Sequence, residues 1–182
     1  LKWLGAGDPV PTLRVAVARG VMRHVVPATP DLNVMARVVR MQSSVAAVDV
    51  LARLFVMMDG YDPEPILRLS RVQSTYLKNL EQMVLEPAWC DETFRRDIYR
   101  YGYDTFLQRL IVDVAERDDI DGAGANDVIG RAIMLRDWPV PRFPITGAEL
   151  LAQGVPPGPA LGARLRTLEQ SWMMNNFELK KE

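Results

Sequence analysis

The stretch DTFLQRLIVDVAER, residues 104–117, carries the clearest helical pattern in the chain. Its apolar side chains recur at spacings of three and four residues, which places them on one face of a helix. These residues are Phe106, Leu107, Leu110, Ile111 and Val114. Strand-like alternation is nearly absent elsewhere, and the same helical spacing recurs along the chain. The sequence therefore predicts an all-α fold, an irregular array of short helices with a small C-terminal helical tail subdomain.

Helix starts can be placed on both sides of this stretch, because Asp, Asn, Ser and Thr favour the N-cap and proline is tolerated in a first turn. The first helix would place Leu13, Val17 and Val21 on one face. Further helices are expected to begin at or just after Pro11, Asp31, Ala47, Ile66, Ser74, Asp91 or Thr93, and Asn126 or Asp127. Asp59-Gly60 and Gly102 are typical of helix ends.

The last third of the chain begins with a proline-rich segment. Pro139, Pro141 and Pro144 force an extended path, which predicts a subdomain boundary there. Thr146 and Glu149 then have the spacing of a capping box, which predicts a short helix that ends at Gly154. A final helix is expected to begin at Pro159, with one apolar face. That face would be formed by Leu161, Leu165, Leu168 and Trp172.

The charge distribution limits the kind of ligand and where it would bind. The 182 residues include 22 Lys and Arg against 23 Asp and Glu, a net charge of −1, which excludes a protein that coats nucleic acid through overall basic charge. Residues 1–60 carry a net +3, residues 61–137 a net −5 and residues 138–182 a net +1. An anionic ligand is therefore expected at the ends of the chain rather than in its middle.

Several kinds of active site can be set aside. A single cysteine, Cys90, excludes an internal disulfide and a multi-cysteine zinc site, and the single histidine, His24, has no plausible catalytic partners nearby in sequence. Asp119 and Asp121 form a D-x-D triplet, but it lies in a glycine-rich loop without the strand that a metal-dependent transferase site needs. We interpret it as a solvated loop tip, and we expect no catalytic residue and no metal site in this chain.

The chain shows no signal for a membrane. Its longest apolar runs, such as residues 54–58, are too short to span a bilayer, and no signal peptide is evident at the start. We therefore expect a cytoplasmic protein without a membrane partner.

The start of the final helix has the chemistry of an anion site. Its first turn contains no acidic residue, although Asp or Glu there would interact favourably with the helix dipole. Gly158 and Gly162 would let a ligand approach the backbone, and Arg164 and Arg166 follow directly. A phosphate could bind the free N–H groups at such a helix start. The alternative is a helix start that simply faces water.

Residues 141–172, PRFPITGAELLAQGVPPGPALGARLRTLEQSW, resemble the class II tRNA nucleotidyltransferases (CCA-adding enzymes) and the related bacterial poly(A) polymerases. The family pattern is P-x-F-P-[IL]-[ST]-G-x-[DE]-L, followed by G-[IV]-x-P-G-P-x-[IVL]-G-x-x-L. The residues that match it are Pro141, Phe143, Pro144, Thr146, Gly147, Glu149, Leu150, Gly154, Val155, Pro157, Gly158, Pro159, Leu161, Gly162 and Leu165.

Weaker matches run upstream in the family's order. They are Asp8-Pro9, Gly20-Val21-Met22 and Val26-Pro27, then the segments 49–54 (DVLARL), 67–70 (LRLS) and 99–102 (YRYG). The resemblance thus covers most of the chain but only the family's C-terminal half. It implies three parts, which are the end of a neck-like helical segment at 1–30, a helical body at 31–137 and a tail subdomain at 138–182.

The family's catalytic parts have no match in these residues. Its head carries Gly-Ser and D-x-D on a small sheet that binds magnesium, and its neck carries E-D-x-x-R, which selects CTP or ATP. The resemblance implies that this chain holds tRNA or another structured RNA through phosphate and sugar contacts, and that its other partner is the head domain. We expect no cofactor in the chain itself, with magnesium belonging to the head. The candidate RNA-binding residues are Arg142, Thr146, Gly158, Gly162, Arg164 and Arg166.

Two alternatives stay open at this point. The parent enzyme could be a poly(A) polymerase, which the body and tail do not distinguish from a CCA-adding enzyme. The chain could also be a helical scaffold that binds proteins and has no role with RNA.

Overall fold

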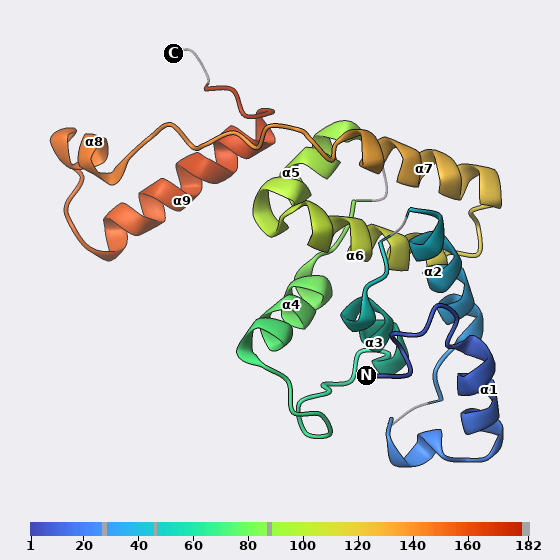
Figure 1. Cartoon of the computed structure of the whole chain (residues 1–182). Coiled ribbons are helices and arrows are strands. Elements are labelled where there is room, and N and C mark those ends of the chain that lie inside the picture. The colour runs from blue at the N-terminus through green and yellow to red at the C-terminus, as the bar shows by residue number, and fades with distance from the viewer. Residues whose placement is uncertain (27–28, 46, 87–88, 180–182) are drawn as a thin grey trace. The chain divides into compact units, whose positions relative to one another are not determined.

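A computed structural model describes residues 1–26, 29–45, 47–86 and 89–179, and all regular structure in them is helical (Figure 1), which confirms the all-α prediction. The elements are α1 (Val10–Ala18), the 3-10 turn η1 (Met22–His24), α2 (Leu32–Ser44), α3 (Val50–Met58), α4 (Arg71–Gln82), α5 (Asp91–Tyr101), α6 (Tyr103–Glu116), α7 (Gly122–Met134), α8 (Gly147–Ala152) and α9 (Pro159–Met174). Pro27, part of one upstream family match, lies outside the described residues.

The chain divides into two compact units, residues 1–136 and 137–182. This division falls beside the expected boundary between residues 137 and 138. The separate neck-like part at 1–30 stays a prediction.

Helix α6 forms the centre of the first unit. It packs against α2, α3, α4, α5 and α7, and the predicted stripe on it is buried, with Phe106, Leu110 and Ile111 fully inaccessible to solvent. Gly102 ends α5 and directly precedes α6, with a φ of 81° that favours glycine. Burying each large apolar side chain contributes roughly 1.5–3 kcal/mol, so α6 organises the core of this unit.

Three predicted helix boundaries are confirmed, two of them starts and one an end. The Asp31 carboxylate accepts hydrogen bonds from the backbone N–H groups of Asn33 and Val34 at the start of α2. Asp59 and Gly60 both have positive φ at the end of α3. Pro159 is the first residue of α9. In each case the signal is local, because the residue type favours that position at a helix boundary.

Three predicted helix starts are wrong, because a nearby residue provides the N-cap instead. Helix α3 begins at Val50, where the Asp49 carboxylate accepts from the N–H of Ala52 at 2.6 Å. Ser70 rather than Ser74 caps α4, through a capping box with Gln73. Asp121 rather than Asn126 or Asp127 caps α7, and its carboxylate accepts from the N–H of Gly124 at 2.7 Å.

Two further expectations are corrected. Residues 66–69 form no helix, because the N–H groups of Ile66 and Leu67 both bond to the carbonyl of Pro63 in a single turn. Val21 is exposed and follows the end of α1, and Ala16 takes the expected buried position beside Leu13. Gly20, with a φ of 69°, lies between the end of α1 and Val21, so the apolar spacing does not continue as helix.

A buried polar network joins four segments of the first unit. Arg53 of α3 is fully buried, and its Nη1 donates to the carbonyls of Leu4 and Ala6 at 2.7 and 2.6 Å. Its Nε donates to Oε1 of Gln42 on α2 at 2.7 Å, and Nε2 of Gln42 donates to Oε1 of Gln108 on α6 at 2.8 Å. The guanidinium thus fixes the N-terminal segment, α2 and α6 relative to α3. Burial lowers the pKa of Arg53, although arginine stays charged in proteins.

Substitution of Arg53 by methionine should destabilise the protein strongly. The change leaves two backbone carbonyls and the Gln42 amide without their buried donor, which should cost about 3 kcal/mol or more. Urea unfolding followed by circular dichroism measures this cost. The matched control is Arg14→Met on α1, where the arginine is exposed. A loss below about 0.5 kcal/mol for Arg53→Met, as expected for a surface substitution, would show that the network is not essential.

The stability of the first unit should also depend on pH through Asp97 on α5. Burial raises the pKa of Asp97 from an ordinary 3.8 to about 6, and nearby Arg100 only partly opposes this effect. Because the folded-state pKa is the higher one, native Asp97 binds its proton more tightly than the unfolded chain does. This term therefore makes the protein less stable as pH rises from about 4 to about 6.

Asp97→Asn should remove this term. Thermal melting midpoints across that pH range should fall more steeply in the wild type than in Asp97→Asn, and the variant should be at least as stable at pH 7. Parallel pH profiles for the two proteins would contradict the assignment.

Candidate nucleic-acid interface

The second unit contains α8, α9 and an extended segment, residues 138–145, that runs back along α9 (Figure 1). Its core is aromatic. The rings of Phe143 and Trp172 lie 5.4 Å apart, Trp172 lies 5.0 Å from Phe177, and Phe177 lies 5.3 Å from Trp138. These aromatic side chains pack against one another, as aromatic pairs at such distances do.

The start of α8 packs on α9 through a glycine. A Cβ on Gly147 would lie 3.7 Å from side-chain carbons of both Leu161 and Leu165, so the two helices approach closely there. The predicted capping box is present. The Thr146 hydroxyl accepts from the Glu149 N–H at 3.3 Å, and a Glu149 carboxylate oxygen accepts from the Thr146 N–H at 2.7 Å. Thr146 is exposed, and its hydroxyl oxygen already serves the helix start.

Helix α9 begins without a side-chain cap and without an acidic residue in its first turn. Gly158 occupies the N-cap with a φ of 109° and a ψ of −152°, a conformation that L side chains rarely adopt. Gly158 is also exposed. The first N–H groups of α9 therefore have no side-chain acceptor, and the positive end of the helix dipole is uncompensated.

One of the candidate arginines lies close to a candidate glycine. A Cβ on Gly162 would meet Nη1 of Arg166 at 3.5 Å, so the guanidinium folds back towards the helix start. Gly158, Gly162 and Arg166 follow one another at intervals of four residues and therefore share one flank of the helix. The structure thus brings Gly162 and Arg166 together, and Gly158 lies about two turns from Arg166 at the start of the helix.

The other two arginines point elsewhere. Arg164 and Arg166 are two residues apart, about 200° around the helix axis, so they lie on different flanks of α9. Arg142 is next to Phe143, which contacts Trp172 near the C-terminal end of α9. With a rise of about 1.5 Å per residue, Gly158 and Trp172 are roughly 20 Å apart along the helix. The predicted site is therefore a spread of separate cations rather than one pocket.

None of these three arginines is neutralised within the described part of the second unit. Arg142, Arg164 and Arg166 are exposed and form no ion pair with a described residue. The carboxylate of Glu149 is bound to the start of α8, and its hydrogen bonds with Thr146 lower its pKa. The second unit thus presents three separate exposed cations, although Asp137, Glu169 and Glu178 also lie in it.

The Asp, His and Cys residues that the sequence analysis rejected as catalytic have structural roles or lie exposed. Asp121 of the D-x-D triplet caps α7, and Asp119 is exposed. The His24 ring accepts a hydrogen bond from Nε of the exposed Arg23. Half-buried Cys90 is the N-cap residue of α5, and its N–H donates to the Thr93 hydroxyl.

The described residues contain neither a metal-binding cluster of acidic, His or Cys side chains nor a membrane-spanning helix. Across residues 1–26, 29–45, 47–86 and 89–179, no three or more His, Cys, Asp or Glu side chains are grouped so that they could hold a metal ion. No helix within those ranges has the length and apolar character needed to cross a membrane.

Sequence reasoning missed two exposed arginines in the first unit. Arg68 and Arg71 flank the N-cap of α4 and form no ion pair among the described residues. They lie in or beside the LRLS segment. The net charge of −5 over residues 61–137 led to no anion site being predicted there.

Comparison of the chain with protein-family models, with curated proteins and with solved structures finds no match.

Proposed function

We propose that this chain is the RNA-holding C-terminal portion of a cytoplasmic tRNA nucleotidyltransferase of the CCA-adding kind. In this proposal the chain binds the sugar-phosphate backbone of tRNA. The transfer of nucleotides from CTP or ATP to the RNA 3′ end, with magnesium, belongs to a catalytic head whose motifs these 182 residues do not contain. The chain alone would bind RNA without extending it.

The observation that carries the proposal is the spread of unpaired arginines over the second unit. A single small anion needs cations that converge on one point, but Arg142 lies beside the C-terminal part of α9, whereas Arg166 lies near the middle of the helix with its guanidinium folded back towards Gly162. A nucleic-acid strand presents phosphates at regular intervals, so cations far apart can each meet one. Structured RNA is recognised largely through its shape, its phosphates and its 2′-hydroxyls, which suits such a surface.

The backbone of the tail supports the resemblance to the family. Gly154 and Gly158 occupy two positions of the family pattern and have φ values of 89° and 109°. Thr146 and Glu149 occupy two further positions of the pattern and form a capping box. These four matched residues therefore suit the backbone geometry of the turn and of the start of α8. The same residues would suit a poly(A) polymerase. A comparison of tRNA with an unstructured RNA as ligands distinguishes the two parent enzymes.

Reversal of single charges on the second unit should weaken tRNA binding. Arg166→Glu should weaken binding about tenfold at low salt, because it loses a charge-assisted contact and repels a phosphate. Arg164→Glu and Arg142→Glu should each have a smaller effect, because each lies apart from the open start of α9. Fluorescence anisotropy with labelled tRNA at low and moderate salt measures these affinities, and the salt dependence should be shallower in each variant.

The matched control is Arg19→Glu, which makes the same change of charge at an exposed arginine just after α1. It should bind tRNA as the wild type does. Wild-type affinity in both Arg164→Glu and Arg166→Glu would refute the site. Absence of RNA binding at any salt, together with a protein captured on pull-down, would favour the scaffold alternative. Equal binding of tRNA and an unstructured RNA would favour the poly(A) polymerase alternative.

A further inference from the structure

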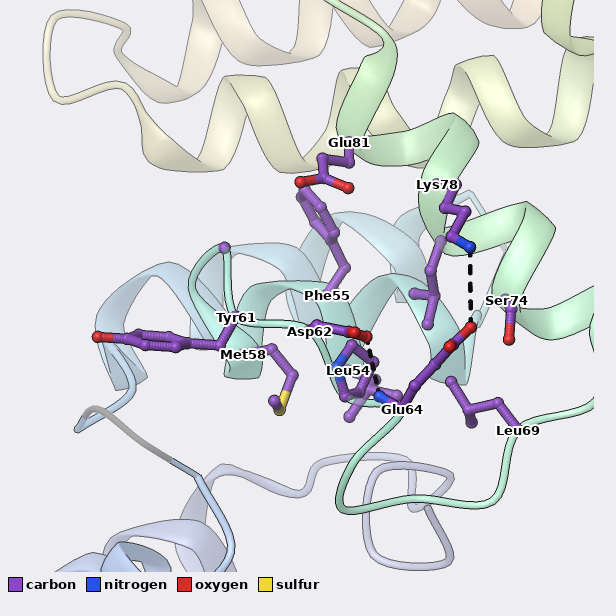
Figure 2. A pocket seen from close by; sticks show the side chains of 13 residues that line it. Leu54, Phe55, Met58, Tyr61, Asp62, Glu64, Leu69, Ser74, Lys78 and Glu81 are labelled. Carbon is purple, nitrogen blue, oxygen red and sulfur yellow. Dashed lines mark hydrogen bonds and ion pairs between the residues drawn. The ribbon is translucent and has the colours of Figure 1, made fainter.

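The segment between α3 and α4, residues 59–70, borders two adjoining hollows in the first unit. One is a cavity of about 230 Å³ between this segment and the two helices, shown in Figure 2. The other is a cleft of about 490 Å³ on the α4 side. Both hollows are lined by Glu64, Leu69, Ser74 and Lys78, so a ligand could occupy both at once.

The cavity is apolar with acidic groups among its lining. Leu54, Phe55 and Met58 of α3 face Leu77 of α4 across it. Asp62 and Glu81 also line the cavity, and neither carboxylate is ion-paired within the described ranges. Asp62 binds the N–H of Glu64 through only one oxygen, at 2.9 Å. The cavity therefore offers an apolar surface together with hydrogen-bond acceptors.

The cleft has the opposite charge. It is lined by three cations, Arg68, Arg71 and Lys78, and by the hydroxyl residues Ser74 and Thr75. Lys78 Nζ lies 3.9 Å from Glu64 Oε1 in an exposed ion pair, drawn as a dashed line in Figure 2. Such a pair contributes little, about 0–1 kcal/mol, so an incoming anion could compete with Glu64 for Lys78. Guanidinium groups suit phosphate because they donate in pairs.

We propose that these hollows bind a nucleotide whose base carries an exocyclic amine, with the base in the cavity and the phosphate in the cleft. The volume of the cavity, about 230 Å³, is below the range of roughly 300–1,000 Å³ typical for drug-sized ligands, so it suits a single base. The carboxylates of Asp62 and Glu81 can accept from an amine, as Asp and Glu do with cytosine N4. They also repel phosphate, which directs it to Arg68 and Arg71.

The nucleotide has two possible sources with the same chemistry. It could be a free nucleoside monophosphate, or an unpaired residue of an RNA strand whose base leaves the stack. This inference goes beyond the proposed RNA-holding site, because it uses only α3, α4 and their connection. It does not depend on α9.

Isothermal titration of the 182-residue chain with AMP, CMP, UMP, adenosine and inorganic phosphate tests the proposal. AMP and CMP should bind at least about tenfold more tightly than UMP, which lacks the amine, and than adenosine or phosphate, which each fill one hollow. The double substitution Arg68→Gln with Arg71→Gln should abolish the advantage of AMP over adenosine. Glu81→Ala should reduce the preference for AMP over UMP.

The control double variant is Arg14→Gln with Arg19→Gln, which removes the same charge at exposed arginines on and after α1. It should bind AMP as the wild type does. Arg164→Glu with Arg166→Glu should also leave AMP binding unchanged, so this site and the α9 site can fail separately. Circular dichroism should show the same helical signal and melting midpoint for each variant, and a variant that unfolds is replaced by the single Arg68→Gln.

Short oligo(A) and oligo(U) strands distinguish the two sources. If oligo(A) binds more tightly than AMP and is displaced by it, the ligand is a strand residue. If oligo(A) binds no more tightly than AMP, the ligand is a free nucleotide. Either result supports the site. Equal affinities for AMP and UMP, absence of AMP binding, or unchanged AMP binding in the folded Arg68→Gln variants would overturn it.

Discussion

The buried guanidinium of Arg53 is the constraint on which the arrangement of the first unit depends. A fully buried charge is costly unless its donors are satisfied. Nη1 and Nε of Arg53 find acceptors only when Leu4, Ala6 and Gln42 lie where they do, and Nη2 has no acceptor among the described residues. Gln108 extends the same network into α6 and donates to the carbonyl of Ala47 at 2.7 Å. The network therefore specifies one arrangement of helices whose apolar faces alone would allow several.

Asp49 plays a related part between α3 and α4. Its carboxylate caps α3 and also accepts a hydrogen bond from the Tyr76 hydroxyl of α4 at 3.1 Å. Burial and the nearby Asp49 raise the pKa of Tyr76, so the phenol stays protonated and continues to donate. The two helices that wall the cavity are thus held together by a hydrogen bond through Asp49, which does not line the cavity.

Local signals in the sequence predicted local structure well. The stripe on α6, the cap at Asp31 and the capping box at Thr146 depend on neighbouring residues, so spacing and residue type were sufficient. Where two caps compete, as Ser70 and Ser74 do, propensity alone does not choose between them. The burial of Arg53 could not be predicted, because arginine is mostly exposed and its acceptors are distant in sequence.

The sequence names candidate residues for the site but does not give their arrangement in space. Arg164 and Arg166 are neighbours in sequence, but helix geometry places them on different flanks, and Arg142 lies near the far end of α9. The cleft lined by Arg68 and Arg71 was not predicted, because the net charge of the long acidic segment 61–137 conceals these two local cations. Both cases have the same cause, since sequence distance is a poor measure of side-chain distance.

Hydrogen–deuterium exchange of the chain with and without tRNA tests the central claim most directly, because it reports where the RNA lies without altering a residue. Binding of tRNA to the second unit predicts slower exchange at the start of α9, around residues 158–166, and along the extended segment near Arg142. It also predicts that this protection weakens as salt is raised, as phosphate contacts do. If tRNA binds but leaves exchange in the second unit unchanged, the second unit is not the surface that holds tRNA.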